Sequence, residues 1–301
     1  MIWVRLAEDG VGTLAALYER RSCLSGCHAE LVEASLSFLF VPFPCRNDPN
    51  PKSKNRVIAL WKLFFSAKLA IPSRVAVRLD QIVPWGRTAR EYELMFRLTA
   101  EDLSSGILDC GGGPASFNAE FTARGHRVIS VDPIYSFSGA EILGRFEATV
   151  PTMLSEVRST PDDWTWTYHR NPDDLCATRR AALDTFLTDY EAGLRDQRYI
   201  VGELPILPFN SGQFGLAVCS HLLFLYSDLL SAGFHVQSVL ELCRVAREVR
   251  IFPLLSLDGK PSPHVVAVRE ALAASGWNSE IVSVDYELQR GGNEMLRVFT
   301  P

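Results

Sequence analysis

The chain has 301 residues, of which 47% are hydrophobic and 22% charged, as in an ordinary globular protein. Its net charge of −5 gives no electrostatic reason to expect a nucleic-acid partner. The longest apolar stretches, 36–44 and 57–71, are interrupted by prolines or lysines and are too short to span a bilayer, so we expect a cytoplasmic protein without a membrane span.

Residues 1–75 differ in character from the rest of the chain. Residues 22–54 show no sustained helical or strand periodicity. The segment 27–35, CHAELVEAS, resembles the peptide produced when a bacterial interspersed palindromic repeat is translated. We therefore expect a weakly structured leader that results from a mis-annotated start, with Val75 and Val77 as candidate true starts. A genuine but weakly structured arm is the alternative.

Residues 76–301 show alternating helix and strand patterns and are expected to form the main domain. Apolar and aromatic side chains recur at three- and four-residue spacing over 88–98, which predicts a helix. The short apolar runs 106–110 and 127–132 predict buried parallel strands. Between them, 115–124 predicts a second helix.

A long section, 134–197, follows the second predicted strand. Its periodicity predicts two helices, at 141–157 and 175–194. Connections at such a point are normally short, so we expect a helical insertion that acts as a cap over the substrate. The loop between the helices is rich in aromatic side chains, which fits either a lid or a small core of the insertion itself. These side chains are Trp164, Trp166, Tyr168 and His169.

The remainder of the chain completes an α/β pattern. Further strands are predicted at 199–202, 216–220, 249–255, 280–285 and 295–299, and helices at 227–248 and 265–275. This alternation is typical of a Rossmann-like, mostly parallel sheet with helices on both faces. Only about ten residues separate the last two strands, too few for a parallel crossover, so we expect an antiparallel C-terminal strand.

The seven cysteines are scattered through the chain. They lack the paired spacing of a zinc site, so no metal centre is predicted. Four of them stand among apolar neighbours and are expected to be small buried side chains in a reducing compartment. These are Cys110, Cys176, Cys219 and Cys243.

A glycine-rich turn follows the first predicted strand, in the segment 108–114, LDCGGGP. Glycines let the backbone approach a ligand, and the helix that follows offers free N–H groups. Asp132 ends the second strand, at the position that holds ribose hydroxyls in nucleoside-binding sheets. Asp109 would repel a pyrophosphate but suits the cationic groups of S-adenosylmethionine. Ser116 stands where a dinucleotide fingerprint has glycine or alanine.

Two later segments extend this pattern. The segment 202–209, GELPILPF, follows the third predicted strand, and 214–221, FGLAVCSH, forms the fourth. In order and spacing, these segments and the glycine-rich turn resemble the class I (Rossmann-like) S-adenosylmethionine-dependent methyltransferase family, over residues 80–299. The lead-in 83–87, VPWGR, looks like that of a bacterial group of these enzymes whose substrate is not known.

The resemblance implies an S-adenosylmethionine site along the carboxyl ends of the first four strands. The implied contacts are Asp109, Gly111 and Gly113 at the methionine end, Asp132 at the ribose, Glu203 and Leu204 at the adenine, and Ser220 beside the methyl group. Arg87, with Tyr92, would close over the cofactor's carboxylate; a surface arginine and a core-facing tyrosine are the alternative. His221 is the candidate general base, or a histidine that only packs.

These features predict methyl transfer to an O, N or C nucleophile of a small molecule. Gly215 stands where the family usually has an acid, which leaves open a non-catalytic cofactor-binding protein. An NAD(P)-dependent oxidoreductase is the other alternative, disfavoured by Asp109 and Ser116. The segment 132–135, DPIY, looks like the signature of nucleic-acid amino-methyltransferases, but that signature belongs after the fourth strand. A nucleic-acid acceptor is therefore not expected, and the oligomeric state stays open.

Overall fold

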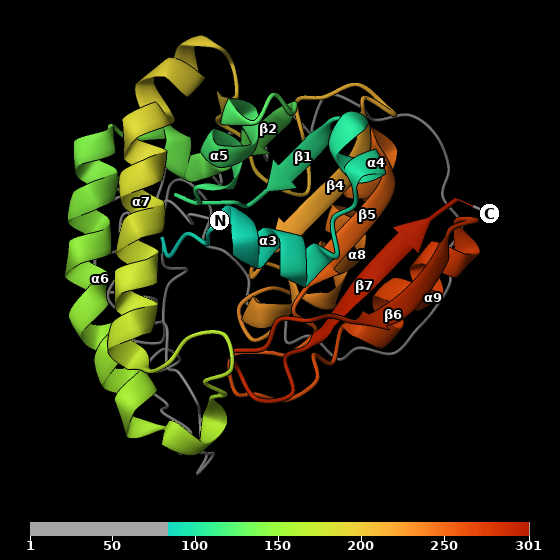
Figure 1. Cartoon of the computed structure of the whole chain (residues 1–301). Helices are drawn as coiled ribbons and strands as arrows, with labels where there is room; N and C mark the ends of the chain where they lie inside the picture. The colour runs from blue at the N-terminus through green and yellow to red at the C-terminus, as the bar shows by residue number, and fades with distance from the viewer. Residues whose placement is uncertain (1–83, 301) are drawn as a thin grey trace, which may run out of the picture. The chain divides into compact units, whose positions relative to one another are not determined.

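The computed structural model describes residues 84–300; the leader expected at 1–75 and its candidate starts lie outside the described residues. The described part is built on one seven-stranded sheet of order β3-β2-β1-β4-β5-β7-β6 (Figure 1). The strands are β1 (Ile107–Cys110), β2 (Val128–Val131), β3 (Tyr199–Ile200), β4 (Phe214–Ser220), β5 (Ala246–Phe252), β6 (Asn278–Ser283) and β7 (Glu294–Phe299). The first five pair in parallel, and β7 is antiparallel to both β5 and β6.

Helices cover both faces of this sheet, as the sequence predicted. They are α3 (Ala89–Phe96), α4 (Ala100–Ser104), α5 (Phe117–Ala123), α6 (Gly139–Ser159), α7 (Pro172–Arg195), α8 (Ala232–Val245) and α9 (Val265–Ala274). Alternate residues of a strand point to opposite faces. Accordingly, Leu216 and Val218 pack in the cluster that contains side chains of α3 and α5, whereas Ala217 and Cys219 pack in the cluster that contains α8 and α9.

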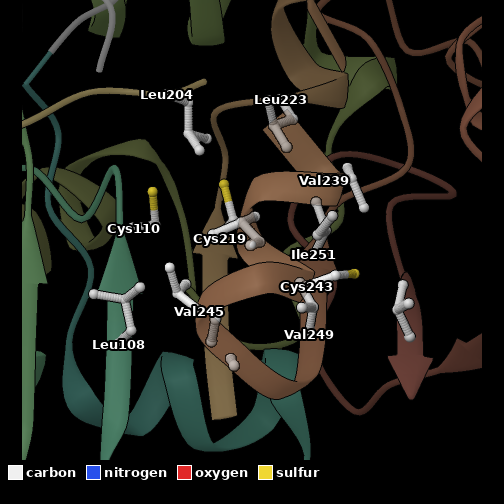
Figure 2. Packing of buried hydrophobic residues seen from close by; sticks show 14 of the residues in the cluster. Leu108, Cys110, Leu204, Cys219, Leu223, Val239, Cys243, Val245, Val249 and Ile251 are labelled. Atoms are coloured by element: carbon white, nitrogen blue, oxygen red, sulfur yellow. The ribbon is translucent and has the colours of Figure 1, made fainter. Parts of the chain in front are cut away.

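Three of the cysteines expected to be buried lie in the core beneath α8. Figure 2 shows Cys110, Cys219 and Cys243 among leucine, valine and isoleucine side chains. Burial raises the pKa of Cys219 and of Cys243 to about 12, so both are neutral thiols. Cys176, on α7, is only half-buried. The prediction was thus right for the three sheet and α8 cysteines and wrong for Cys176, whose helix faces solvent at that position.

The expected insertion between the second and third strands consists of α6 and α7, which pack against each other (Figure 1). The first helix begins at a capping box in which Ser138 and Glu141 satisfy each other's backbone N–H groups. The second begins at Asn171, whose side chain accepts from the N–H of Asp174. Together with Tyr135 and Tyr199 the two helices enclose a third apolar cluster, so the insertion has its own core.

The predicted helix 227–248 was too long at both ends. Ser231 caps α8 by accepting from the N–H of Phe234, which places its start later in the chain. At the other end, Ala246 already pairs with Phe214 of β4, because the strand takes the backbone groups that a helix would use. Correspondingly, β5 begins earlier than predicted and ends at Phe252, since Pro253 has no N–H for the sheet.

Within residues 84–300, no helix is both long enough and apolar enough to cross a membrane. The same residues contain no group of three or more His, Cys, Asp or Glu side chains arranged to hold a metal ion.

Candidate functional site

The turn after β1 has a backbone conformation that favours glycine. Gly111 and Gly113 have φ of +70° and +56°, in the left-handed region. A Cβ on Gly112 would overlap the carboxylate of Asp109. The turn is crossed by the lead-in segment, where a Cβ on Gly86 would overlap the backbone of Pro114. The glycines therefore allow the lead-in segment, the turn and the Asp109 side chain to pack closely at the carboxyl end of β1.

Asp109 lies directly behind this turn and is 1% exposed. It accepts hydrogen bonds from the hydroxyls of Tyr92 and Ser130, each at 3.0 Å. Burial raises its pKa to about 7, although these two hydrogen bonds oppose the change. The structure thus places Asp109 where it supports the turn from behind. Tyr92 faces the core, which confirms the alternative prediction for this residue, a core-facing tyrosine.

Asp132 fixes the other side of the turn. It is fully buried, and its carboxylate accepts from the N–H of Gly113 at 2.9 Å and of Ile134 at 2.8 Å. Tyr135 donates its hydroxyl to the carbonyl of Gly113 at 2.9 Å. Its ring packs against the aromatic side chains of Phe186 and Tyr199. The acid predicted at the ribose is therefore a hydrogen-bonding partner of the glycine-rich turn.

A cavity opens at the carboxyl ends of β1 and β4. It encloses ≈ 1070 Å³, its opening included. Five of the residues predicted for the site line it, namely Arg87, Gly111, Gly113, Ser220 and His221. Glu203 and Leu204 instead line a second hollow formed by residues 201–208. The structure thus brings Gly111 and Gly113 together with Ser220 and His221, whereas Asp109 and Asp132 are buried beside the turn and do not line the cavity, and the two residues predicted for the adenine lie in a different hollow.

The insertion and the C-terminal loops form the remaining walls of the cavity. Side chains from α6, α7 and the loop between them contribute Met153, Val157, Trp164, Leu175 and Arg179. Segments after β5 and before β7 contribute Pro253, Leu257, Tyr286, Leu288 and Gln289. The loop 260–264, which follows β5, does not line the cavity. Its His264 is turned toward the carbonyl of Ser227 instead.

The tip of the insertion is hydrogen-bonded to the loop between β6 and β7 (Figure 1). The N–H of Thr165 donates to the carbonyl of Leu288, and the N–H of Arg290 donates to that of Asp163, both at 2.8 Å. The Arg290 guanidinium also donates to the carbonyls of Asp162 and Trp164. These bonds join two segments that both line the cavity, although they are far apart in the sequence.

His221 stands at the end of β4 in a strained conformation. Its φ is +51°, which is unusual for a residue with a Cβ, and its N–H donates to the carbonyl of Phe252 at 2.6 Å. Its Nδ1 lies 2.8 Å from the hydroxyl oxygen of Ser220. Burial, followed by the charges of Arg87 and Arg179, lowers its pKa well below the ordinary value. The imidazole is therefore neutral at neutral pH.

A buried ionic network adjoins the cavity, and the sequence did not reveal it. Glu91 is fully buried and accepts from Arg179 Nη1 at 2.6 Å and from the Tyr286 hydroxyl at 2.7 Å. It also lies 3.2 Å from His169 Nε2. Burial alone would favour the neutral acid, but Arg179 and the hydrogen bonds hold the pKa of Glu91 well below its usual range. The Thr88–Glu91 capping box is a sequence signal for the helix start, but nothing signals the distant partners.

Arg87 and Arg179 are the charged residues among the described side chains that line the cavity. The Arg87 Nη1 donates to the carbonyl of Trp85 at 2.8 Å. The Nε of Arg87 and the indole Nε1 of Trp85 are buried and find no partner among residues 84–300. Burial and the nearby charge of Arg179 lower the pKa of Arg87. Two residues that line the cavity thus each carry a buried N–H donor without a partner among the described residues.

Gly215, the departure from the family pattern, lies near the amino end of β4. A Cβ there would overlap the side chain of Ser105, so this position cannot hold an acid without displacing its neighbour. Ser220 and His221, which line the cavity, are at the opposite end of the strand. The missing acid therefore leaves the cavity walls unchanged.

No protein-family model matches the chain. The chain is 31% identical over 221 residues to an uncharacterized protein, MJ0045, of Methanocaldococcus jannaschii. The aligned region covers 73% of this chain and 97% of the relative. A solved structure of magnesium protoporphyrin IX methyltransferase from Synechocystis PCC 6803, with bound S-adenosylhomocysteine, aligns at 12% identity over 71% of this chain and 84% of that one, with a TM-score of 0.37. A SAM-dependent methyltransferase from Aquifex aeolicus aligns at 14% identity over 65% and 82%, with a TM-score of 0.32.

These superpositions are distant, and the fold assignment rests on the topology itself. The five parallel strands, with β7 antiparallel between β5 and β6, form the mostly parallel Rossmann-like sheet with an antiparallel C-terminal strand that the sequence predicted. The chain therefore belongs to the family of MJ0045 and has the class I, Rossmann-like fold of S-adenosylmethionine-dependent methyltransferases.

Proposed function

We propose that the protein transfers the methyl group of S-adenosylmethionine to an O, N or C nucleophile of a small molecule. The observation that supports this most is the glycine-rich turn, whose backbone lines a cavity at the carboxyl end of β1. Ligands of such sheets bind at this edge, where strands of opposite connection diverge. The cofactor would supply the electrophilic methyl group, and the protein would hold both partners in line and exclude water.

The residues around the turn fit the methionine end of this cofactor. Gly111 and Gly113 leave the backbone bare toward the cavity, and Arg87 offers a guanidinium with an unpartnered Nε for a carboxylate. Asp132 adds negative charge beside the turn, which suits the ammonium and sulfonium groups, and Asp109 supports the turn from behind. The contacts of Glu203 and Leu204 with the adenine stay a prediction.

His221 is the proposed base for acceptors whose nucleophile carries a proton. Its neutral imidazole lines the cavity, and the Ser220 hydroxyl near Nδ1 would fix the ring's orientation. We expect His221→Asn to lower kcat about 100-fold for such an acceptor, with S-adenosylhomocysteine affinity changed less than threefold. A loss of cofactor affinity of the same size would assign the histidine to binding instead.

Calorimetry with S-adenosylhomocysteine, S-adenosylmethionine and NAD tests the cofactor. We expect both S-adenosyl compounds to bind and NAD to give no heat. A radiolabelled methyl-transfer screen against a metabolite extract, with His221→Asn as the matched control, then tests catalysis. Binding of NAD without either S-adenosyl compound would overturn the proposal, and binding without any transfer would leave a cofactor-binding protein.

A further inference from the structure

We infer that the methyl acceptor carries a carboxylate on an apolar body, and that Arg179 of the insertion, with Trp85, binds this carboxylate. The inference rests on the proposed function, because it concerns the acceptor half of the same cavity. It comes from three features of the walls: their charge, their unpartnered N–H groups and their apolar surface.

The charge around the cavity becomes positive when the cofactor binds. Two guanidinium groups, those of Arg87 and Arg179, line the cavity, and Glu91 behind the wall compensates Arg179. The charge of Arg87 is opposed by the carboxylate of Asp132, which accepts from the N–H of Gly113 on the cavity wall. S-adenosylmethionine adds a sulfonium and an ammonium against one carboxylate, so it brings one net positive charge that these residues leave uncompensated. A monoanionic acceptor would restore the balance in a cavity where charge is poorly screened.

The position of Arg179 is fixed by contacts that do not occupy the whole guanidinium. It is 1% exposed, with Nη1 donating to Glu91 at 2.6 Å and Nη2 placed 3.4 Å from the Tyr286 hydroxyl. An arginine has further N–H groups beyond these two, in a planar fork that matches a carboxylate. Since Glu91 also accepts from Tyr286, arginine and tyrosine are held side by side on the wall.

The unpartnered N–H groups lie on the same cavity wall as the charge. Trp85 is 8% exposed and its buried indole Nε1 has no partner among residues 84–300, and the same holds for the Nε of Arg87. A buried donor without an acceptor is unfavourable, and a bound ligand can supply the missing acceptor. An indole N–H and a guanidinium N–H both donate, and a carboxylate offers only acceptors.

The rest of the wall indicates the body of the acceptor. Met153, Val157, Leu175, Leu225 and Leu288 give aliphatic surface, and Trp164 adds an indole face. A strongly hydrated sugar or polyamine would lose water to these side chains without replacement. The site thus fits an acceptor with a flat or aliphatic apolar body and one carboxylate.

Calorimetry on the full chain saturated with S-adenosylhomocysteine tests the inference. The probes are 3-phenylpropionate, its amide 3-phenylpropanamide, and phenyl phosphate. We expect the carboxylate to bind at least tenfold more tightly than the amide, and no less tightly than the phosphate. Equal binding of acid and amide, or no binding of the acid, overturns the inference, and a clear preference for the phosphate overturns the carboxylate.

Variants of two adjacent arginines on α7 locate the effect. Arg179→Gln should abolish the preference for the acid over the amide, whereas Arg180→Gln should keep it, because Arg180 is exposed and pairs with Glu147 and Asp184. The double variant Glu91→Gln/Arg179→Gln avoids leaving a buried carboxylate unpaired and should lose the preference in the same way. Retention of the preference in the double variant contradicts the inference. Failure of S-adenosylhomocysteine itself to bind the wild type contradicts the proposed function instead.

Discussion

Gly112 and Asp109 meet at the point where β1 turns toward α5. The carboxylate of Asp109 lies where a Cβ of residue 112 would be, so the turn packs directly against a buried acid. Such an arrangement leaves the bare backbone facing the cavity and the acid behind it. Two substitutions separate what each residue contributes.

Replacing Gly112 by alanine should displace the turn from Asp109. We expect a loss of stability of about 1–3 kcal/mol, as for other overpacked positions, and at least a tenfold loss of S-adenosylhomocysteine affinity. Urea unfolding and calorimetry measure the two effects. Gly144→Ala is the matched control, because its Cβ would meet nothing and its place within α6 favours alanine by about 0.5–1 kcal/mol. Unchanged affinity in Gly112→Ala would show that the turn does not contact the ligand.

Asp109 should make the stability of the protein fall as pH rises through neutrality. Its pKa in the folded chain is about 7 against an ordinary value of 3.8, so the folded state holds this proton at pH values where the unfolded chain has lost it. Relative to Asp109→Asn, the free energy of unfolding of the wild type should fall by about 2 to 3 kcal/mol between pH 5 and pH 8. Urea unfolding at intervals across this range measures the difference. A flat or rising difference would mean that the folded carboxyl is already ionised at pH 5.

The positions of individual site residues could be predicted from the sequence where their partners are close to them in the chain. The glycine-rich turn and Asp132 follow strands directly, so their place at the sheet edge could be inferred from strand order alone. The role of Glu91 could not, because its partners Arg179 and Tyr286 lie 88 and 195 residues away. Burial of Asp109 was missed for the same reason: Tyr92 and Ser130, which enclose it, come from other elements.

The insertion and the β6–β7 loop act as one wall of the cavity. Each contributes backbone groups to the hydrogen bonds between them, and Arg290 crosses from one to the other. The wall has its own apolar cluster under α6 and α7, which includes Trp164. The choice left open by the sequence, a lid or a core of the insertion, is thus resolved in part: Trp164 belongs to the core and also lines the cavity.

Arg290→Ala should loosen this wall without unfolding the sheet. The side chain donates to the carbonyls of Asp162 and Trp164, so its loss should increase hydrogen exchange of the Thr165 and Arg290 region about tenfold, a local opening of about 1.4 kcal/mol. Mass spectrometry of exchange follows the two segments separately. Arg269→Ala is the control, because it removes surface hydrogen bonds between α9 and Ser279 of β6. It should leave the hydrogen exchange of both segments unchanged. Exchange that rises equally throughout the sheet would point to global destabilisation.

Elements were predicted better than their ends. Periodicity located the α6–α7 insertion and the antiparallel strand pair, because long amphipathic patterns and a short connection both constrain the chain strongly. It misplaced the junction of α8 and β5, where Ala246 and Arg247 fit either element by local preference. The pairing of Ala246 with Phe214 in β4 decides that boundary, and this pairing is a tertiary contact that periodicity does not contain.

Glu91 connects three distant parts of the described chain. This carboxylate binds α3 to α7 through Arg179 and to the segment before β7 through Tyr286, so it connects the start, the insertion and the end of the described chain. Around it the sheet has a core on each face, and the insertion adds a third. Removing one partner of a buried ion pair destabilises the fold strongly, because the other partner is then left charged and unpaired.

Glu91→Gln should therefore lower the free energy of unfolding by about 3 kcal/mol at pH 7, because it leaves Arg179 charged and buried. Since the folded pKa of Glu91 lies well below its ordinary value of 4.5, its contribution is fully present above that value and is lost as pH falls through the lower one. The difference between wild type and variant should stay constant from pH 7 to about 5 and shrink in more acidic solution. Urea unfolding of both proteins across this range measures it.

Glu93→Gln is the control for this prediction, because Glu93 lies on the same helix but pairs with Arg90 and Arg124 at the surface. Its loss should cost at most about 1 kcal/mol. The double variant Glu91→Gln/Arg179→Gln should be less destabilised than the sum of the two single variants, since each single change leaves a partner unsatisfied. Additive losses would mean that the two side chains stabilise the domain independently, and the link between its start, insertion and end would then have to lie in the apolar contacts of α3 instead.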